Sequence, residues 1–124
     1  LCVEDHFINQ KMITAIFKDL GVDIHIANNG REGYDKAQEL KPDLILMDLH
    51  MPLMDGFETV RKIRTNPILR KTPVVALSAD AFIEQKQGAL DAGFDDYITK
   101  PVDLDRDIPI FAKYLRRERR STVF

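Results

Sequence analysis

Residues 44–52 read Leu-Ile-Leu-Met-Asp-Leu-His-Met-Pro, and this stretch decides the fold. Its first four residues are apolar and run without a polar break into Asp48, a pattern typical of a strand buried on both faces of a parallel sheet. Open parallel sheets bind ligands at the carboxyl ends of their strands, so Asp48 is a candidate functional residue. Taken alone, the stretch is equally compatible with an aspartate that only starts a turn.

A chain of 124 residues is long enough for one packed core, and we predict a single domain over residues 1–124. Its 44% apolar and 31% charged residues are typical of a globular chain, and the net charge of −2 gives no general reason to expect a nucleic-acid partner. One cysteine, Cys2, excludes an internal disulfide and a cysteine metal cluster. No apolar run approaches the roughly 18 to 20 residues of a membrane span, and no signal peptide precedes Leu1, so we expect a cytoplasmic chain without membrane contact. Because the chain opens inside an apolar segment, we also expect its first strand to be truncated.

Five segments have the length and pattern of strands: residues 1–3, 22–27, 44–48, 73–77 and 96–99. The second alternates apolar and polar residues, which places it at a sheet edge. Helical segments between the strands predict an α/β fold, a doubly wound (βα)5 three-layer sandwich of the flavodoxin type with a parallel five-stranded sheet. The edge strand favours the order 2-1-3-4-5, with right-handed crossovers and the first and third strands as neighbours at the switch point.

Apolar residues at helical spacing predict the buried faces of the helices. We expect these faces to be Ile8, Met12, Ile16 and Leu20 with Ala15; Tyr34, Ala37 and Leu40; Phe57, Val60 and Ile63; and Ile108, Phe111, Ala112 and Leu115. Capping boxes begin two helices at Asn29 and Asp55, Gly21 ends the first helix, and another helix runs from about Phe82 to Gly93. Pro109 falls near the start of the last helix, where the first turn has no intrahelical N–H bond to lose.

Polar residues at the strand ends predict the chemistry. Glu4, Asp5 and Asp48 meet at the switch point, and three adjacent carboxylates repel one another unless a positive charge compensates them. Zinc lacks soft or imidazole ligands at suitable spacing, whereas Mg²⁺ takes oxygen ligands and is held by one or two carboxylates with phosphate. One divalent cation and Lys100, at the end of the fifth strand, balance the three carboxylates, and Ser78 adds a hydroxyl donor.

This set of residues suits phosphoryl transfer to a carboxylate. Asp48 is the predicted nucleophile, while Mg²⁺ and Lys100 neutralise charge on the transferred group. Ser78 would hydrogen-bond a phosphoryl oxygen of the aspartyl phosphate, and Ala79 is small enough not to crowd it. Because the chain has no Walker loop or glycine-rich nucleotide fingerprint, bound ATP is not the expected donor.

The chain closely resembles the receiver domain of two-component response regulators. The residues that carry the resemblance are Val3-Glu4-Asp5, Asp48, Met51-Pro52, Met54-Asp55-Gly56, Ser78-Ala79, Ala92-Gly93, Asp96-Tyr97 and Lys100-Pro101. Glu4-Asp5-x-x-Ile8-Asn9-Gln10-Lys11 and Lys100-Pro101-Val102 are similar to receivers of hybrid histidine kinases and phosphorelays, more than to receivers of DNA-binding regulators.

The resemblance implies a signalling phosphoacceptor rather than an enzyme with a separate substrate. Asp48 would take its phosphoryl group from a phosphohistidine of a histidine kinase or a histidine phosphotransfer domain. Asp5, Asp48 and the backbone carbonyl of His50 would ligate Mg²⁺, with Mn²⁺ as an alternative ion, and Glu4 would act through water. The module would sit in the cytoplasm, free or tethered to a membrane-bound kinase, without direct contact to nucleic acid.

The resemblance also implies a conformational switch. Ser78 would move toward the phosphoryl group, and the ring of Tyr97 would turn inward into the space it leaves. That change would remodel the surface of the fourth helix, fifth strand and fifth helix, the expected output or homodimer face. The peptide bond between Lys100 and Pro101 is expected to be cis.

Several positions depart from the family pattern or leave alternatives open. His6 stands where a small polar residue is usual, and with His50 it is predicted to line the rim of the site; pH-tuned access or transition-metal binding is the alternative. His50 and Asp80 leave the lifetime of the aspartyl phosphate open. Residues 116–124 are predicted to be a basic helix end or tail, solvated or bound to an acidic partner.

Two other classes compete with the receiver. A haloacid dehalogenase-type phosphohydrolase also uses an aspartate at a strand end, but it needs a second aspartate where this chain has His50. A pseudo-receiver that only docks partners would lack the phosphoacceptor or the lysine, and here both are present.

Overall fold

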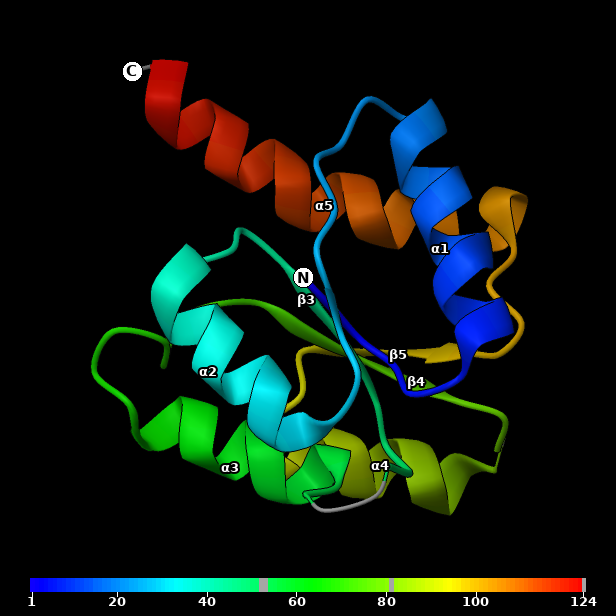
Figure 1. Cartoon of the computed structure of the whole chain (residues 1–124), viewed down its shortest axis with the longest axis vertical. Coiled ribbons are helices and arrows are strands. Elements are labelled where there is room, and N and C mark those ends of the chain that lie inside the picture. Colours follow the sequence, from blue (N-terminus) through cyan, green and yellow to red (C-terminus); the bar gives the residue numbers. More distant parts are fainter. Residues whose placement is uncertain (52–53, 81, 124) are drawn as a thin grey trace.

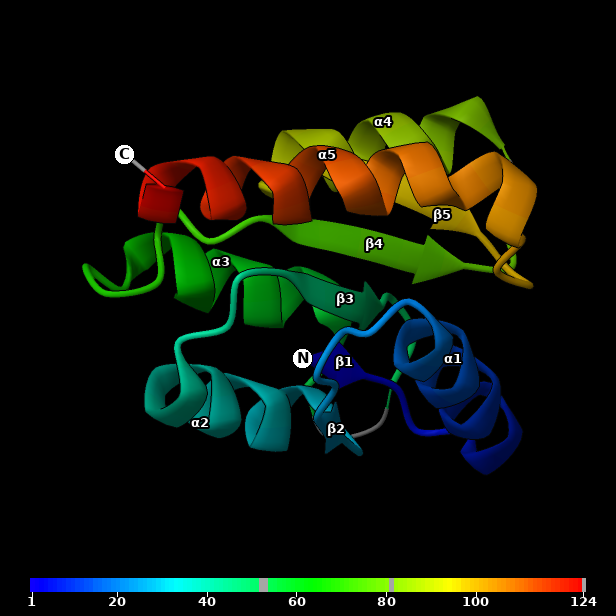
Figure 2. The same cartoon turned by 90° about the horizontal axis from the view of Figure 1, so that it is seen from above.

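The computed structural model describes residues 1–51, 54–80 and 82–123, with side chains as far as Leu115 (Figure 1). It forms one parallel sheet of β1 (Cys2–Val3), β2 (Ile26–Ala27), β3 (Ile45–Asp48), β4 (Val74–Ser78) and β5 (Asp96–Thr99). Figure 2 shows the five strands side by side in the order β2-β1-β3-β4-β5. The predicted strand order is therefore confirmed.

Five helices cover the two faces of this sheet (Figure 1). On one face lie α1 (Phe7–Asp19) and α5 (Leu104–Val123), and on the other lie α2 (Gly30–Leu40), α3 (Gly56–Thr65) and α4 (Ile83–Ala92). Each face has its own buried apolar cluster, so the molecule has the three layers that the alternating pattern predicts. None of the described helices is long and apolar enough to cross a membrane.

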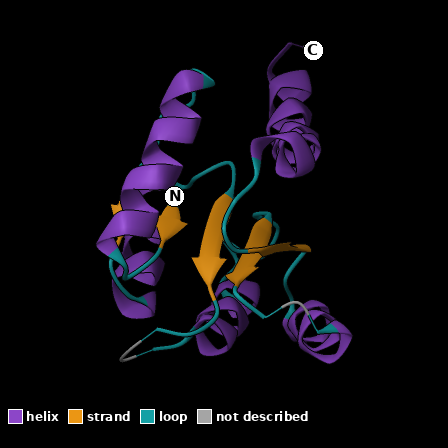
Figure 3. Cartoon of the chain, turned by 90° about the vertical axis from the view of Figure 1, so that its right-hand side faces the viewer, coloured by secondary structure: helices purple, strands orange, loops and turns teal. Residues whose placement is uncertain are grey.

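The sheet register places the functional strand ends beside one another. Asp48 pairs with Leu77 across β3 and β4, and Ser78 pairs with Thr99 across β4 and β5. The strands lie between the helices (Figure 3), and every pair of neighbouring strands is parallel. The residues that follow the strands therefore emerge at one edge of the sheet. Ser78 and Lys100 therefore leave the sheet close to Asp48.

The predicted second strand is shorter than its alternating pattern. Pairing is confined to Ile26 and Ala27, because β1 offers only two residues to pair with them. The preceding apolar residues Val22 and Ile24 still pack against the α1 and α5 side of the sheet, while Ala27 is buried on the opposite face. The predicted alternation of side chains between the two faces is thus correct, although only Ile26 and Ala27 pair with β1.

The predicted buried face of α1 is wrong. Ile13 and Phe17 are the buried residues, whereas Ile8 is 74% exposed. The ring of Phe17 packs at 4.8 Å, centroid to centroid, from that of Phe111 on α5, and this contact sets the rotation of the helix. The other residues expected on the buried face are exposed or half-buried: Met12, Ala15, Ile16 and Leu20.

The last helix also differs from its predicted pattern. Phe111 is buried as expected, but Asp107 and Tyr114 are buried instead of Ile108. The helix begins at Leu104, so Pro109 lies inside it, beyond the first turn. On α2, the predicted core residue Leu40 is exposed.

The predicted ends of the other helices are confirmed. Asn29 accepts a hydrogen bond from the Glu32 N–H at 2.8 Å, and Asp55 accepts one from the Glu58 N–H at 2.9 Å. The predictions for Pro52 and for the side chains of residues 116–124 lie outside the described part of the chain.

Candidate functional site

Three carboxylates meet at the switch point of the sheet. Glu4 and Asp5 follow β1 directly, Asp48 ends β3, and these two strands pair with each other. One oxygen from each of the three side chains lies within 4.8 Å of the other two. Glu4 and Asp48 are buried and Asp5 is half-buried, so water compensates their negative charge poorly.

Lys100 supplies a positive charge to this acidic cluster. Its Nζ lies 2.7 Å from Glu4 Oε1 and 3.0 Å from Asp48 Oδ2. Burial opposes the charged ammonium, but the hydrogen bonds to Glu4 and Asp48 outweigh it and raise the pKa of Lys100 above its ordinary value. The peptide bond between Lys100 and Pro101 is cis, as the resemblance implies, and the Lys100 N–H donates to the Ser78 carbonyl at 2.7 Å.

The acidic cluster offers the oxygen ligands that a hard divalent cation prefers. Asp5 Oδ1 is buried and accepts no hydrogen bond from the described residues, while the His6 Nε2 atom lies 4.0 Å away. A single lysine leaves the cluster with excess negative charge. Carboxylate oxygens are ligands that Mg²⁺ prefers, so the side chains of Glu4, Asp5 and Asp48 could hold such an ion.

The two histidines lie at the rim. The side chains of His6 and His50 are both exposed, which agrees with the predicted rim position. The backbone N–H of His50 donates to Asp48 Oδ1 at 3.1 Å and helps to orient the carboxylate.

Ser78 and Tyr97 are linked through the main chain of Asp80. The buried Ser78 Oγ accepts a hydrogen bond from the Asp80 N–H at 3.1 Å, and the Tyr97 hydroxyl donates to the Asp80 carbonyl at 2.5 Å. Tyr97 is only 8% exposed, so its ring already lies inward against the core. Ala79, between Ser78 and Asp80, is exposed. Sequence reasoning missed this link because it runs through backbone atoms, which no side-chain pattern reveals.

Gln10 was also missed as a support of the site. Its Nε2 donates to the Glu4 carbonyl at 2.5 Å and to Asn28 Oδ1 at 2.8 Å. The side chain therefore ties the loop that carries Glu4 and Asp5 to α1 and to the turn after β2. Gln10 belongs to the motif that resembles receivers of hybrid histidine kinases, but the motif does not show what its side chain contacts.

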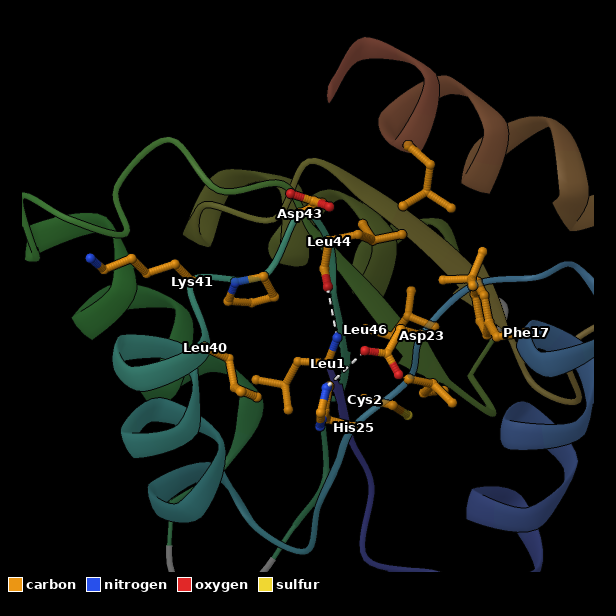
Figure 4. A pocket seen from close by; sticks show the side chains of 14 residues that line it. Leu1, Cys2, Phe17, Asp23, His25, Leu40, Lys41, Asp43, Leu44 and Leu46 are labelled. Carbon is orange, nitrogen blue, oxygen red and sulfur yellow. Dashed lines mark hydrogen bonds and ion pairs between the residues drawn. The ribbon is translucent and has the colours of Figure 1, made fainter. Parts of the chain in front are cut away.

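A cavity of about 230 Å³ lies at the opposite end of the strands (Figure 4). Its lining includes Leu1, Leu40, Leu44 and Leu115, and the Leu1 amino group donates to the Leu44 carbonyl at 3.0 Å. The acidic cluster is at the carboxyl ends of the strands, where ligands bind in open α/β sheets. The cavity is therefore separate from the candidate site.

Comparisons with known proteins agree with this geometry. Residues 1–108 match the model of the response regulator receiver domain. The signal transduction histidine-protein kinase BarA of Shigella flexneri is 35% identical over 114 residues. That match covers 92% of this chain but only 12% of the kinase, so the chain spans about an eighth of that relative's length.

Solved receiver domains share the architecture. The receiver of sensor histidine kinase PA1611 from Pseudomonas aeruginosa, which holds a magnesium ion in its active-site cleft, is 32% identical with a TM-score of 0.84, covering 91% of this chain and 93% of that one. The receiver of Ssk1 from Saccharomyces cerevisiae, crystallised with the histidine phosphotransfer protein Ypd1, is 29% identical with a TM-score of 0.82, covering 91% and 85%.

Proposed function

The chain belongs to the response regulator receiver domain family of two-component signalling, and from this premise we propose that Asp48 accepts a phosphoryl group from a phosphohistidine in a Mg²⁺-dependent reaction. The observation that carries the proposal is the position of Asp48. This carboxylate is buried at a strand end, beside two further carboxylates and 3.0 Å from the Lys100 ammonium. In the reaction, an Asp48 oxygen forms a bond to phosphorus while the bond from phosphorus to the histidine nitrogen breaks, and the electron pair stays on that nitrogen.

The charge of the site supports the role of magnesium. When bound, Mg²⁺ would neutralise the incoming phosphoryl oxygens and the carboxylates together. Asp5, Asp48 and the His50 carbonyl would hold it directly, and Glu4 would act through water. The magnesium ion of the related PA1611 receiver supports this assignment.

The residues of the chain itself would position and stabilise the phosphoryl group. The pKa of Lys100 is raised, so its ammonium stays charged and would pair with a phosphoryl oxygen after leaving one of its carboxylates. The Ser78 hydroxyl would donate to a second oxygen. Ala79 is exposed and carries only a methyl group, which leaves room for the phosphoryl group above it.

The donor in this proposal is a histidine kinase or a histidine phosphotransfer domain. A related receiver forms a complex with such a phosphotransfer protein, which supports this class of partner. In this chain, apolar side chains at the start of α1 are exposed beside the acidic cluster: Phe7 is 66% and Ile8 74% exposed. Apolar surface of this kind next to the phosphoacceptor suits a protein donor more than a small molecule.

The signal would leave through α4, β5 and α5. On phosphorylation, Ser78 Oγ would turn from the Asp80 N–H to the phosphoryl group and release the start of the loop before α4. Because Tyr97 is already turned inward, the movement needed in this chain is that of Ser78 and the Asp80 segment. Phe82 and Ile83 at the start of α4 are strongly exposed, and the proposed output or homodimer surface includes them.

The test is exposure of the chain to acetyl phosphate or beryllofluoride with Mg²⁺, followed by intact mass and NMR chemical shifts. We expect one stable modification that is lost in Asp48→Asn and kept in Asp35→Asn, an aspartate outside the acidic cluster. Rapid turnover of a small phosphate ester would instead favour a phosphohydrolase. Absence of any response would favour a docking module.

A further inference from the structure

The first turn of α5 contains a buried carboxylate that the proposed reaction does not use. Asp107 is 1% exposed, although the sequence pattern offers no reason for an aspartate there. Its Oδ1 accepts from Arg106 Nε at 2.8 Å, and its Oδ2 accepts from Arg106 Nη2 at 2.8 Å. Asp107 Oδ2 also accepts from the Asp103 N–H at 2.9 Å. The carboxylate is therefore fully engaged, with a bidentate guanidinium partner.

The same guanidinium holds the segment that carries Lys100. Arg106 Nη2 donates to the Thr99 carbonyl at 2.6 Å and to the Pro101 carbonyl at 3.2 Å. These carbonyls belong to the residues immediately before and after Lys100. Arg106 thus connects a carboxylate fixed in α5 to both sides of the lysine that contacts the acidic cluster.

Helix capping explains only part of this arrangement. Asp107 accepts from the Asp103 N–H, and its negative charge is favourable near the helix N-terminus. Asp103 also caps the first turn, because its Oδ1 accepts a hydrogen bond from the Arg106 N–H at 3.3 Å. The bonds from Arg106 to the Thr99 and Pro101 carbonyls lie outside the helix and are not explained by capping. A cation at a helix N-terminus is unfavourable with respect to the helix dipole, and a buried carboxylate is costly to desolvate. The hydrogen bonds to Asp107 raise the pKa of Arg106, in agreement with a tight pair. The contact that remains to be explained is that of Arg106 with the backbone on either side of Lys100.

We propose that Arg106 and Asp107 are positioning residues that fix the backbone of residues 99–101 and thereby aim the Lys100 ammonium at the phosphoryl group on Asp48. The inference rests on the proposed function of Asp48 and Lys100. Lys100 Nζ meets two carboxylates at 2.7 and 3.0 Å, and a backbone shift of about 1 Å would break such contacts. Lys100 is outside the proposed metal ligands, so displacing it would slow phosphoryl transfer without lowering Mg²⁺ affinity.

The test replaces both residues together, as Arg106→Leu with Asp107→Leu. The Arg106 side chain is half-exposed, and removal of Asp107 also removes the acceptor of the Asp103 N–H. We therefore expect the double variant to unfold cooperatively, at a lower urea concentration than the unmodified chain. We expect its maximal rate of Asp48 phosphorylation by saturating acetyl phosphate to fall by about 10- to 100-fold. Mg²⁺ affinity, followed by NMR because the chain has no tryptophan, should not fall.

Two further variants make the result specific. Arg106→Lys keeps one charged donor and should recover part of the lost rate, which a purely structural role in α5 would not produce. Asp105→Leu removes an exposed carboxylate from the same turn and should phosphorylate at the native rate. If the double variant does not fold, the single Arg106→Lys and Arg106→Gln variants are compared in the same assay.

The outcomes separate the two proposals. If the unmodified chain shows no modification that depends on Asp48, the proposed function fails. If it is modified, and a folded double variant, or Arg106→Gln in its place, reacts at the native rate, the positioning role is overturned. A loss of rate accompanied by an equal loss of Mg²⁺ affinity would also overturn it, because the damage would then extend to the metal ligands.

Discussion

Replacing Lys100 with methionine tests the electrostatic account of the site. Lys100 contacts both Glu4, whose side chain is fully buried, and Asp48, whose side chain is 5% exposed. The variant keeps a side chain of similar length but leaves two desolvated carboxylates without this cation. Removing one partner of a buried ion pair costs about 3–5 kcal/mol. Because the Lys100 side chain is itself 16% exposed, we expect the lower end of that range, in the absence of metal.

Magnesium should compensate for part of this loss. A divalent cation at the acidic cluster replaces the missing positive charge, so the variant should gain more stability from Mg²⁺ than the unmodified chain does. A ligand at 100 times its dissociation constant stabilises the folded state by about 2.7 kcal/mol. The measurement is urea unfolding followed by circular dichroism, with EDTA or with Mg²⁺, for each chain.

A double-mutant cycle with Asp48→Asn isolates the charge effect. When one of the two carboxylates is already neutral, removal of the lysine should cost at least about 1 kcal/mol less. Lys113→Met, on the exposed side of α5, is the matched control and should change stability by no more than about 0.5 kcal/mol. The reasoning is refuted if Lys100→Met loses under about 1 kcal/mol in EDTA, or if Mg²⁺ stabilises both chains equally.

Three further predictions concern the packing around the site. Gly56→Ala places a Cβ 2.5 Å from the carbonyl oxygen of the last residue of β3 and should lower the free energy of urea unfolding by about 1–3 kcal/mol. Gly88→Ala, with no neighbouring atom within 4 Å of the added Cβ, should raise it by about 0.5–1 kcal/mol, and equal effects of the two variants would contradict the close approach at Gly56. Burial raises the pKa of Cys2 from 9.0 to about 12, so the thiol ionises at a lower pH in the unfolded chain than in the folded one, and the free energy of unfolding should fall as the pH rises above 9.0. The same decline in Cys2→Ala would disprove the assignment to this thiol. Phe17→Ala should cost about 3–5 kcal/mol, and Ile8→Ala no more than about 0.5 kcal/mol; the reverse order would restore the buried face predicted from sequence.

Local patterns were enough to predict most of the fold. The apolar run before Asp48 and the alternation before Ala27 distinguish a central strand from an edge strand, and the strand order follows from that difference. The caps at Asn29 and Asp55 involve only residues three positions apart, so the sequence contains both partners.

The rotation of α1 could not be predicted in this way. The helix carries two apolar series, one containing Ile8 and the other Ile13 and Phe17, and both have helical spacing. The choice between them depends on Phe111, which lies on the last helix and far away along the chain. Periodicity identifies an amphipathic helix, but a distant packing partner decides which face is buried.

The same distinction between local pattern and distant contact applies to the residues of the candidate site. Residues that would act through their own side chains, such as Asp48 and Lys100, are identified by chemical type and position at a strand end. The residues that hold others in place act through backbone groups, which are available at every position of the sequence. Asp80 uses its own N–H and carbonyl to bond Ser78 and Tyr97, and the Arg106 side chain donates to the Thr99 carbonyl. Sequence therefore predicts which groups take part in the proposed chemistry, whereas the contacts of Arg106 with the carbonyls on either side of Lys100 are seen only in the folded chain.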